Sequence, residues 1–328
     1  MGSFPVLSRT TFRELGAFFF LLTLCLLVGT RQPEFLSVAN IKDVLVQISG
    51  IAVAASGMTL VIVSAGIDLS VGSVLALSGC VGSLVGLGLS ERGPAWMVES
   101  NLHILLAVVA AIGVGGLCGL GNGLLITSLG LPPFIATLGT MSVARGLAFA
   151  VSDSSPVQVL DGLRFAARAR PLGVPFPIVL LLLVYLACLL LLRYTILGRH
   201  CYAIGGNEAA ARLSGVGIGL CKIVVYALCG MLSAVSGLIV AGRLAWMQPQ
   251  EGDAFELDVI AAVVIGGTSL YGGEGTMTGT LIGALIMGVV RNGLNLMAVE
   301  YNVQKIVIGS IIILAVSADV LLKRFARR

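Results

Sequence analysis

The sequence is poor in charged residues. Asp, Glu, Lys and Arg make up only 11% of its 328 residues, whereas hydrophobic residues make up 57%. Soluble globular domains carry roughly 25% charged residues, so this chain has too little polar surface to cover a water-soluble globule of its size. The composition excludes a soluble enzyme and predicts a polytopic membrane protein.

The sequence motifs of nucleotide and metal sites are also missing. The chain has no G-x-x-x-x-G-K-[ST] phosphate loop, no G-x-G-x-x-G fingerprint and no H-E-x-x-H motif. Its seven cysteines form no C-x-x-C pair, and all but Cys201 lie in or beside apolar runs, where a thiol behaves as a small hydrophobic group. We therefore expect no metal, no cofactor and no disulfide, and the chain itself should not bind or hydrolyse ATP.

The charged and polar residues that are present argue against two further classes of protein, nucleic-acid-binding proteins and membrane enzymes. The net charge of +4 is spread along the chain except at the C-terminal KRFARR, so we expect no nucleic-acid partner. A membrane enzyme would need paired acids, or a nucleophile with its base in one cavity, and the sequence shows neither. We therefore predict that the chain is not an enzyme.

Three ionisable residues in or beside the apolar runs are candidates for a functional role: Asp68, Arg145 and Arg291. Buried charge is costly in lipid and often marks an ion pathway, but a proton relay would need more carboxylates than these. The two arginines either reach outward to the interface or line an outer cavity. Asp68 is interpreted as the N-cap of the helix that begins with SVGSV, where its acid meets the positive end of the helix dipole.

The apolar runs predict an all-α fold with about ten transmembrane helices, because a spanning helix needs about 20 mostly apolar residues. The runs lie at about 15–28, 43–64, 70–89, 103–127, 132–151, 174–193, 219–240, 255–271, 277–296 and 303–322. An even number puts both termini on one side, and the basic residues at both ends favour the cytoplasm. Arg164, Arg168 and Arg170, on the outer side, count against this orientation. We predict one transmembrane domain over residues 1–328.

Two connections are longer than the rest. The outer one, 152–173, is either an ordered cap or a flexible loop, and it offers a docking surface. The inner one, 194–218, predicts a short helix at the membrane surface: Gly205 and Gly206 form the turn, Asn207 is the N-cap and Gly215 ends the helix. On these residues alone, the helix is either a connector stabilised by a Glu208–Arg212 ion pair or a docking surface for another protein.

Two rows of glycine at helical spacing also stand out: Gly115, Gly119 and Gly123, and then Gly275, Gly279 and Gly283. Such rows let helix backbones approach closely. They predict tight helix packing or, alternatively, a flexible gate.

Several longer stretches together resemble the ribose-type permeases of bacterial ABC sugar importers. They are VIVSAGIDLSVGSVLALSG (61–79), NGLLI (122–126), PPFIATLGTMSVARGLA (132–148), LGRHCYAIGGNEAAARLSGV (197–216), ELDVIAAVVIGGTSLYGGEGTMTGTLIGALIMG (256–288) and RNGLNLM (291–297). The resemblance implies a subunit of about ten spans in the bacterial inner membrane, paired as a homodimer or with a similar permease. It also implies an ATP-binding subunit on the cytoplasmic side and a periplasmic sugar-binding protein.

The resemblance further implies that GGNEAAARLSG is the segment that docks on the ATP-binding subunit. The implied contact set is Gly206, Asn207, Glu208, Ala209, Ala210, Arg212, Leu213, Ser214 and Gly215. Sugars are bound by amides, hydroxyls and acids, so Thr137, Thr140, Asn292 and Asn295 are candidates for the translocation path. Hydrogen bonding between helices is the alternative role for these four residues.

The expected function is import of a monosaccharide, a pentose, a hexose or a related polyol, driven by ATP hydrolysed on a partner chain. The alternative is a self-sufficient secondary transporter or facilitator, in which the 194–218 connection has no partner. The residues do not distinguish one sugar from another.

Overall fold

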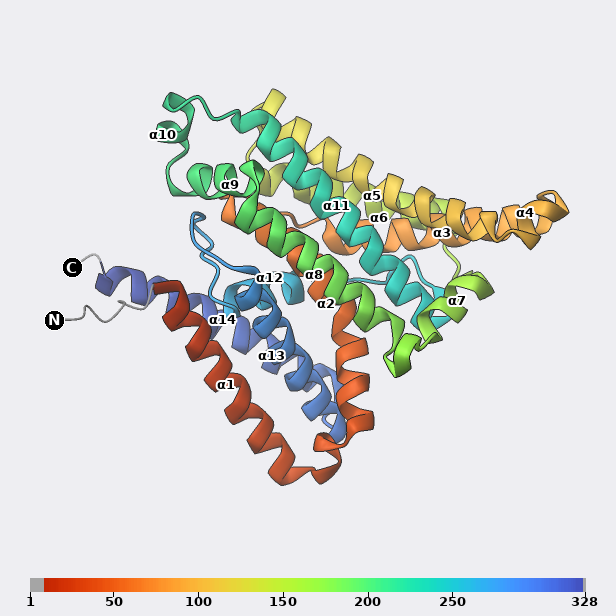
Figure 1. Ribbon diagram of the computed structural model, residues 1–328, viewed down its shortest axis with the longest axis horizontal. Helices are drawn as coiled ribbons and strands as arrows, with labels where there is room; N and C mark the ends of the chain where they lie inside the picture. Colours follow the sequence, from red (N-terminus) through yellow and green to blue (C-terminus); the bar gives the residue numbers. More distant parts are fainter. Residues whose placement is uncertain (1–8, 327–328) are drawn as a thin grey trace.

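The computed structural model describes residues 9–326, and in them nearly all regular structure is helical (Figure 1). The helices are α1 (Arg9–Arg31), α2 (Val38–Val63), α3 (Val71–Arg92), α4 (Ala95–Glu99), α5 (Leu102–Ser128), α6 (Pro133–Val151), α7 (Asp161–Arg168), α8 (Phe176–Tyr194), α9 (Ile196–Gly206), α10 (Glu208–Leu213), α11 (Ile218–Leu244), α12 (Phe255–Ile265), α13 (Met277–Leu296) and α14 (Tyr301–Ala326). Short 3-10 turns lie at Pro33–Leu36 and Pro171–Gly173. Two strands of two residues, β1 (Val157–Gln158) and β2 (Trp246–Met247), pair antiparallel.

Eight helices in the described part of the chain are long and apolar enough to cross a membrane: α1, α2, α3, α5, α6, α8, α11 and α13. Within α14, a shorter apolar segment runs over Asn302–Leu314. The prediction of an all-α polytopic membrane protein is confirmed.

The predicted run 255–271 forms a half-length helix followed by a loop. Helix α12 has 11 residues, which rise only about 16 Å against roughly 30 Å of hydrocarbon. The chain then turns through Gly267, Gly272 and Gly273, whose φ angles of 93°, 82° and 74° favour glycine. Hydrophobicity alone could not reveal this break, because the loop residues stay mostly apolar or small.

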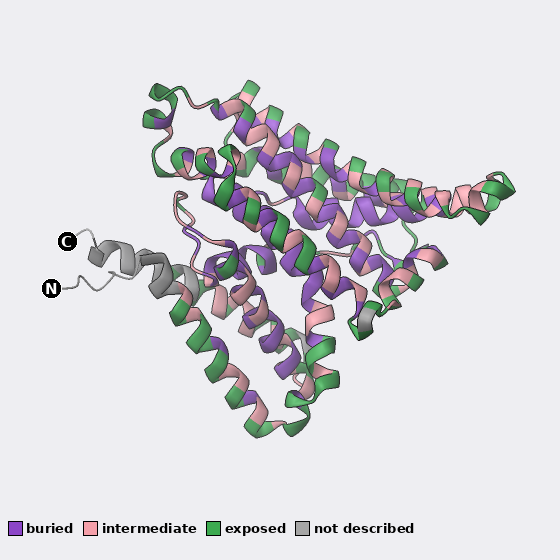
Figure 2. Ribbon diagram, in the orientation of Figure 1, coloured by how far each residue is buried: buried purple, intermediate pink, exposed green. Residues whose placement is uncertain are grey.

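Helix α2 lies at the centre of the bundle and packs against α8, α11, α12 and α13. Most of its residues after Ile48 are buried, as the purple ribbon of Figure 2 shows. In contrast, α1, α5 and α8 expose large apolar side chains such as Phe19, Leu117 and Leu183. Because a bilayer is as apolar as these side chains, this exposed belt is the surface expected to face lipid.

Glycines bring α5 and α11 into backbone contact, as the first glycine row predicts. A methyl group added at Gly115, Gly119 or Gly123 would overlap or crowd backbone atoms of α11. In the second row, Gly279 and Gly283 pack in the same way on the end of α12 and on Gly266. Gly275 lies in the loop before α13, so its place in that row was wrong.

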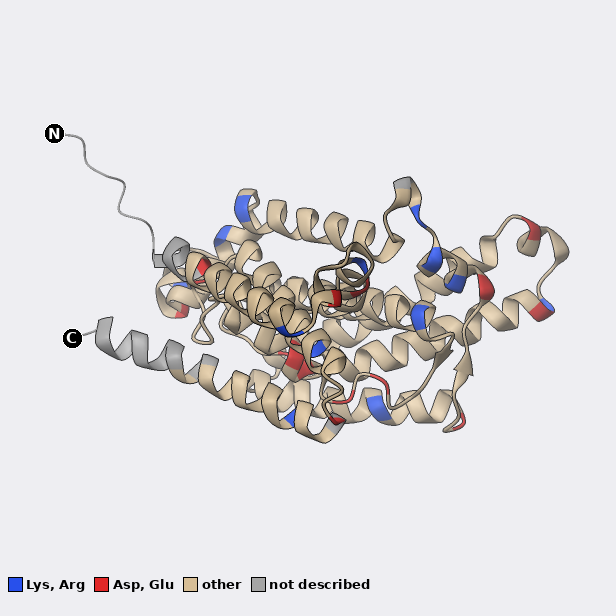
Figure 3. Cartoon of the chain, turned by 90° about the horizontal axis from the view of Figure 1, so that it is seen from below, with Lys and Arg blue, Asp and Glu red and all other residues tan. Residues whose placement is uncertain are grey.

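The two long connections lie at opposite ends of the bundle. Figure 1 shows α9 and α10 at the end where α1 begins and α14 ends, and α4 and α7 at the other end. Most of the chain in Figure 3 is tan, and the blue and red segments lie towards both ends with a further group near the middle. The 152–173 connection is an ordered cap, because β1 pairs with β2 and α7 packs on α11 near Gly242.

Candidate functional site

The 194–218 connection contains two helices where the sequence predicted one. Thr195 caps α9, its hydroxyl accepting from the Gly198 amide at 3.3 Å. Gly205 and Gly206 belong to the last turn of α9, so the predicted turn at these glycines was wrong. Position 205 needs a glycine, because any side chain there would overlap the Val63 carbonyl and the Gly273 amide. The chain turns one residue later, at Asn207.

Helix α10 has the ends that the sequence predicts. The Asn207 side chain accepts from the Ala210 amide at 3.0 Å, which makes it the N-cap. At the other end Gly215 has a φ of 79°. Its amide donates to the Arg212 carbonyl at 3.1 Å, and the Val216 amide donates to the Ala211 carbonyl at 3.1 Å, which is a Schellman ending. A six-residue helix is thus fixed at both ends by local bonds.

The predicted contact set lies on the accessible face of this segment. Glu208 is half-buried and the other eight residues of the set are exposed. Ala211, which the set leaves out, is buried. The apolar side chain of Leu213 is 91% exposed at the end of the helix, which makes it the largest apolar group available to a partner there.

Glu208 bridges two helices. Its Oε1 accepts from Arg212 at 3.2 Å, as the i, i+4 spacing predicts, and its Oε2 accepts from Lys222 of α11 at 2.8 Å. The hydrogen bond from Lys222 lowers the pKa of Glu208, and the bond from Arg212 adds to this effect. The Lys222 contact was missed in the sequence, although a lone lysine at the start of an apolar run was its visible sign.

A cleft of about 550 Å³ opens beside this ion pair. Its walls come from α10, the start of α11, the end of α5 and the start of α6, and its lining includes Pro132 and Pro133 as well as Glu208 and Lys222. The accessible face of α10 therefore continues into a concave polar surface.

The loop after α12 is hydrogen-bonded to α9 and to the end of α2. The Tyr202 hydroxyl of α9 donates to the Gly275 carbonyl at 2.6 Å, and the Gly273 amide donates to the Val63 carbonyl at 2.9 Å. These bonds join α9, the end of α2 and the 266–276 loop into one unit.

The four candidate path residues divide between α6, which carries Thr137 and Thr140, and α13, which carries Asn292 and Asn295. The buried Thr137 hydroxyl turns back on its own helix, donating to the Pro133 carbonyl at 2.9 Å, and Thr140 lies half-buried one turn further on. Asn292 exchanges two hydrogen bonds with Asn40, at 2.9 and 3.0 Å. Asn295 is exposed and accepts from Gln304 at 2.9 Å. Asn292 therefore has the interhelical role that was its alternative.

Arg145 forms hydrogen bonds and an ion pair with the loop before α12, and Arg291 forms an ion pair with α12 itself. Arg145 donates to the carbonyls of Pro249 and Glu251 and pairs with Asp253 at 2.8 Å. Arg291 pairs with Asp258 in the first turn of α12. Both guanidinium groups are thus held by acceptors from α12 or the loop before it. Arg291 also lines a pocket of about 380 Å³ at the start of α12, which agrees with the second of its two predicted roles.

The interpretation of Asp68 as the N-cap of α3 was wrong, because Asp68 lies two residues before the cap. Ser70 is the N-cap of α3, and Asp68 Oδ1 accepts from the Ser70 amide at 2.9 Å and from its hydroxyl at 2.6 Å. The Asn122 amide also faces Asp68 Oδ1, at 3.4 Å. Asp68 is 1% exposed, and it forms no ion pair with any described residue.

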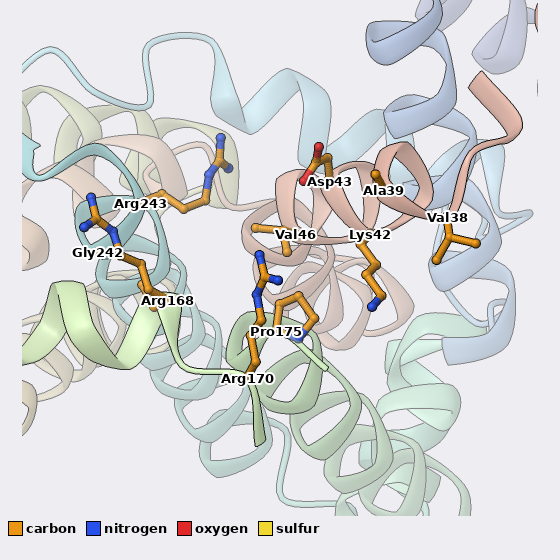
Figure 4. A pocket seen from close by; sticks show the side chains of 11 residues that line it. Val38, Ala39, Lys42, Asp43, Val46, Arg168, Arg170, Pro175, Gly242 and Arg243 are labelled. Atoms are coloured by element: carbon orange, nitrogen blue, oxygen red, sulfur yellow. The ribbon is translucent and has the colours of Figure 1, made fainter. Parts of the chain in front are cut away.

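A basic pocket opens at the opposite end of the molecule from α10 (Figure 4). Its volume is about 630 Å³, and it lies between the start of α2, the end of α7 and the end of α11. Four exposed cations line it: Lys42, Arg168, Arg170 and Arg243. Asp43 is the acid among its lining residues, and in Figure 4 its carboxyl points away from the Lys42 ammonium.

No three His, Cys, Asp or Glu side chains gather as a metal site within the described residues. The seven cysteines are free, and the closest approach recorded between two of their sulfurs is 3.9 Å, between Cys201 and Cys221. The arrangement offers two polar surfaces at opposite ends of an apolar bundle.

Comparisons with known proteins agree along nearly the whole chain. Residues 40–316 match the family described as "Branched-chain amino acid transport system / permease component". The ribose import permease protein of Escherichia coli K12 is 45% identical over 305 residues, 91% of each chain. The D-allose transport system permease protein of the same strain is 37% identical over 312 residues, covering 94% of this chain and 92% of its own. Its galactose/methyl galactoside import permease protein is 34% identical over 327 residues, 97% of each. No solved structure matches the chain.

Proposed function

Because this chain belongs to the ribose-type permease family of bacterial ABC sugar importers, we propose that it carries a pentose or hexose inward using ATP hydrolysed on a separate subunit. It is a multi-pass protein of the inner membrane. The family description mentions amino acids, but relatives aligned over more than nine-tenths of the chain are named for ribose, allose and galactose. These names favour a monosaccharide as cargo.

The observation that carries this proposal is helix α10. A short helix with caps at both ends and eight exposed contact residues, Leu213 among them, is a rigid surface for a partner. We assign Gly206, Asn207, Glu208, Ala209, Ala210, Arg212, Leu213, Ser214 and Gly215 to contact with the ATP-binding subunit. The adjoining cleft beside Glu208 and Lys222 extends that contact.

Movement of α10 has a route into the bundle. It is joined to α9 through Asn207 and to α11 through the Glu208–Lys222 pair. Helix α11 in turn packs backbone to backbone on α5. A tilt of α10 driven by the ATP-binding subunit would therefore move α5 and α11 as a pair, which is how rigid-body closure opens a path alternately to two sides.

The proposed topology is one transmembrane domain, 1–328, with about ten spans and both termini cytoplasmic. The eight long helices supply eight spans, and α14 and the half-helix α12 with its loop supply the other two. Support for the orientation comes from Figure 1, in which α1 begins and α14 ends at the same end as α10.

The outer basic pocket is the proposed docking surface for a periplasmic sugar-binding protein. Lys42, Arg168, Arg170 and Arg243 present positive charge in a concave site, which suits acidic side chains of a partner. This assignment also gives a reason for the arginines that break the charge asymmetry between the two sides.

We further propose that a second copy, or a similar permease, completes the translocation path. Thr137 and Thr140 lie on α6 and Asn292 and Asn295 on α13, and none of the four lines a pocket described above. A path formed by them would draw on residues of two subunits. Thr140 is the strongest candidate, because Asn292 and Asn295 already have partners within the chain.

The test of the proposal is Glu208→Lys. The change places a third cation beside Arg212 and Lys222 and reverses the charge offered to a partner, so copurification with the ATP-binding subunit and sugar uptake should each fall about ten-fold, the effect of roughly 1.4 kcal/mol. Melting in detergent should show that the permease stays folded.

The matched control is Glu91→Lys, the same charge reversal on an exposed acid at the far end of α3. It should leave copurification unchanged. Normal assembly and uptake by Glu208→Lys would contradict the assignment of α10.

A further inference from the structure

A line of polar side chains leads from α10 into the bundle along one face of α11. Lys222, Tyr226 and Cys229 are spaced four and three residues apart, which puts them on the same side of the helix. Lys222 holds Glu208 at 2.8 Å. Tyr226 and Cys229 lie deeper, both fully buried.

Tyr226 joins α11 to the segment between α2 and α3. Its hydroxyl donates to the Ile67 carbonyl at 3.1 Å. Gly66 leaves the space for it, since an added methyl there would lie 2.5 Å from the Tyr226 oxygen. The tyrosine is therefore fixed against the residue directly before Asp68.

The Asp68 carboxyl accepts hydrogen bonds from two elements, the start of α3 and α5. Its Oδ1 accepts from Ser70 at the start of α3 and from Asn122 of α5. Asn122 also donates to the Ser70 hydroxyl at 3.0 Å, so the cluster is bonded within itself as well.

One atom of this cluster has no partner. Asn122 Oδ1 is buried and accepts no hydrogen bond from any described residue. A buried acceptor left unpaired is costly, and in native structures it calls for a structural reason. A cluster that exchanges partners when α11 moves would leave such an atom unpaired in one arrangement and use it in the other.

We propose that Asp68, with Ser70, Asn122 and Tyr226, is the joint through which movement of α10 and of the α11–α5 pair reaches α3. The proposal rests on the transport function proposed above and names the residues that transmit the movement. In this account Asp68 is a positioning residue: it binds neither sugar nor ATP. The hydroxyl of Tyr226 is the contact that makes α11 act on the Asp68 segment.

The experiment uses the assembled transporter in vesicles, with the ATP-binding subunit and the liganded binding protein. Tyr226→Phe removes one hydroxyl and keeps the ring. Sugar transported per ATP hydrolysed should fall about five-fold, the effect of losing one hydrogen bond, while assembly and basal ATP hydrolysis remain. Asp68→Asn, which keeps the shape of the side chain, should act in the same direction.

The two changes affect one unit, so the double variant should lose no more than about the larger single loss. Tyr185→Phe is the matched control, because it removes a tyrosine hydroxyl bonded to Thr278 at 3.2 Å between α8 and α13, away from the Asp68 cluster. It should transport normally.

The proposal would be overturned if Tyr226→Phe and Asp68→Asn both transported as much sugar per ATP hydrolysed as the unchanged protein. A lower melting temperature with unchanged transport per ATP would overturn it too, because the cluster would then only support the fold. A different result would refute the proposed function itself, namely sugar uptake by the wild-type chain without the ATP-binding subunit.

Discussion

Single residues explain why the charges of this chain lie where they do. Glu208 with Lys222 fixes α10 to α11, and Arg145 with Asp253 fixes the loop before α12. Each pair joins residues on separate elements, so sequence spacing gave no sign of either. The pair that spacing did predict, Glu208 with Arg212, lies within one turn of one helix.

The outer basic pocket gives a prediction at this scale. Arg168→Glu should weaken docking of the binding protein about ten-fold, because it replaces an attraction by a repulsion in the lining of the pocket. The dissociation constant, measured on the permease in lipid discs at low and high salt, checks this. The effect should shrink at high salt.

Arg92→Glu is the control, since Arg92 is an exposed arginine at the end of α3 and is not part of the pocket. Equal loss of docking in both variants would point to a general effect of charge and count against this pocket.

At the scale of elements, local signals were read correctly and distant contacts were not. Asn207 and Gly215 mark the ends of α10 because caps are made by residues within one turn of the helix end. The turn assigned to Gly205 and Gly206 failed because a glycine can serve close approach as well as turning. Gly205 faces Val63 and Gly273, from two other elements, and only the fold brings these together.

The contact between α5 and α11 makes a prediction for helix packing. An alanine methyl at Gly119 would overlap the backbone carbonyl of Tyr226, which cannot move aside without parting the helices. Gly119→Ala should therefore destabilise the permease by about 1–3 kcal/mol, the usual cost of overpacking, seen as a lower melting temperature in detergent.

The same helix supplies the control. Gly121 has open space where a side chain would go, so Gly121→Ala should be neutral or slightly stabilising, as alanine favours a helix over glycine. If both variants melt alike, close backbone packing is not what the glycine row provides.

At the scale of the molecule, composition and apolar runs were enough for the fold class. An all-α membrane bundle follows from 57% hydrophobic and 11% charged residues. The layout inside the bundle did not follow, because α12 and its loop are as apolar as a spanning helix and differ only in backbone path. Among the candidate path residues, Asn292 is satisfied by Asn40, 252 positions away, a contact that no spacing could reveal.

The central claim is that this chain moves sugar only when a separate ATP-driven subunit acts on α10, and uptake of labelled ribose into vesicles tests it most directly. Vesicles that contain this chain alone should take up no sugar above background, with or without an ion gradient. Adding the ATP-binding subunit, ATP and the sugar-loaded binding protein should start uptake. Gradient-driven uptake by the chain alone would contradict the account.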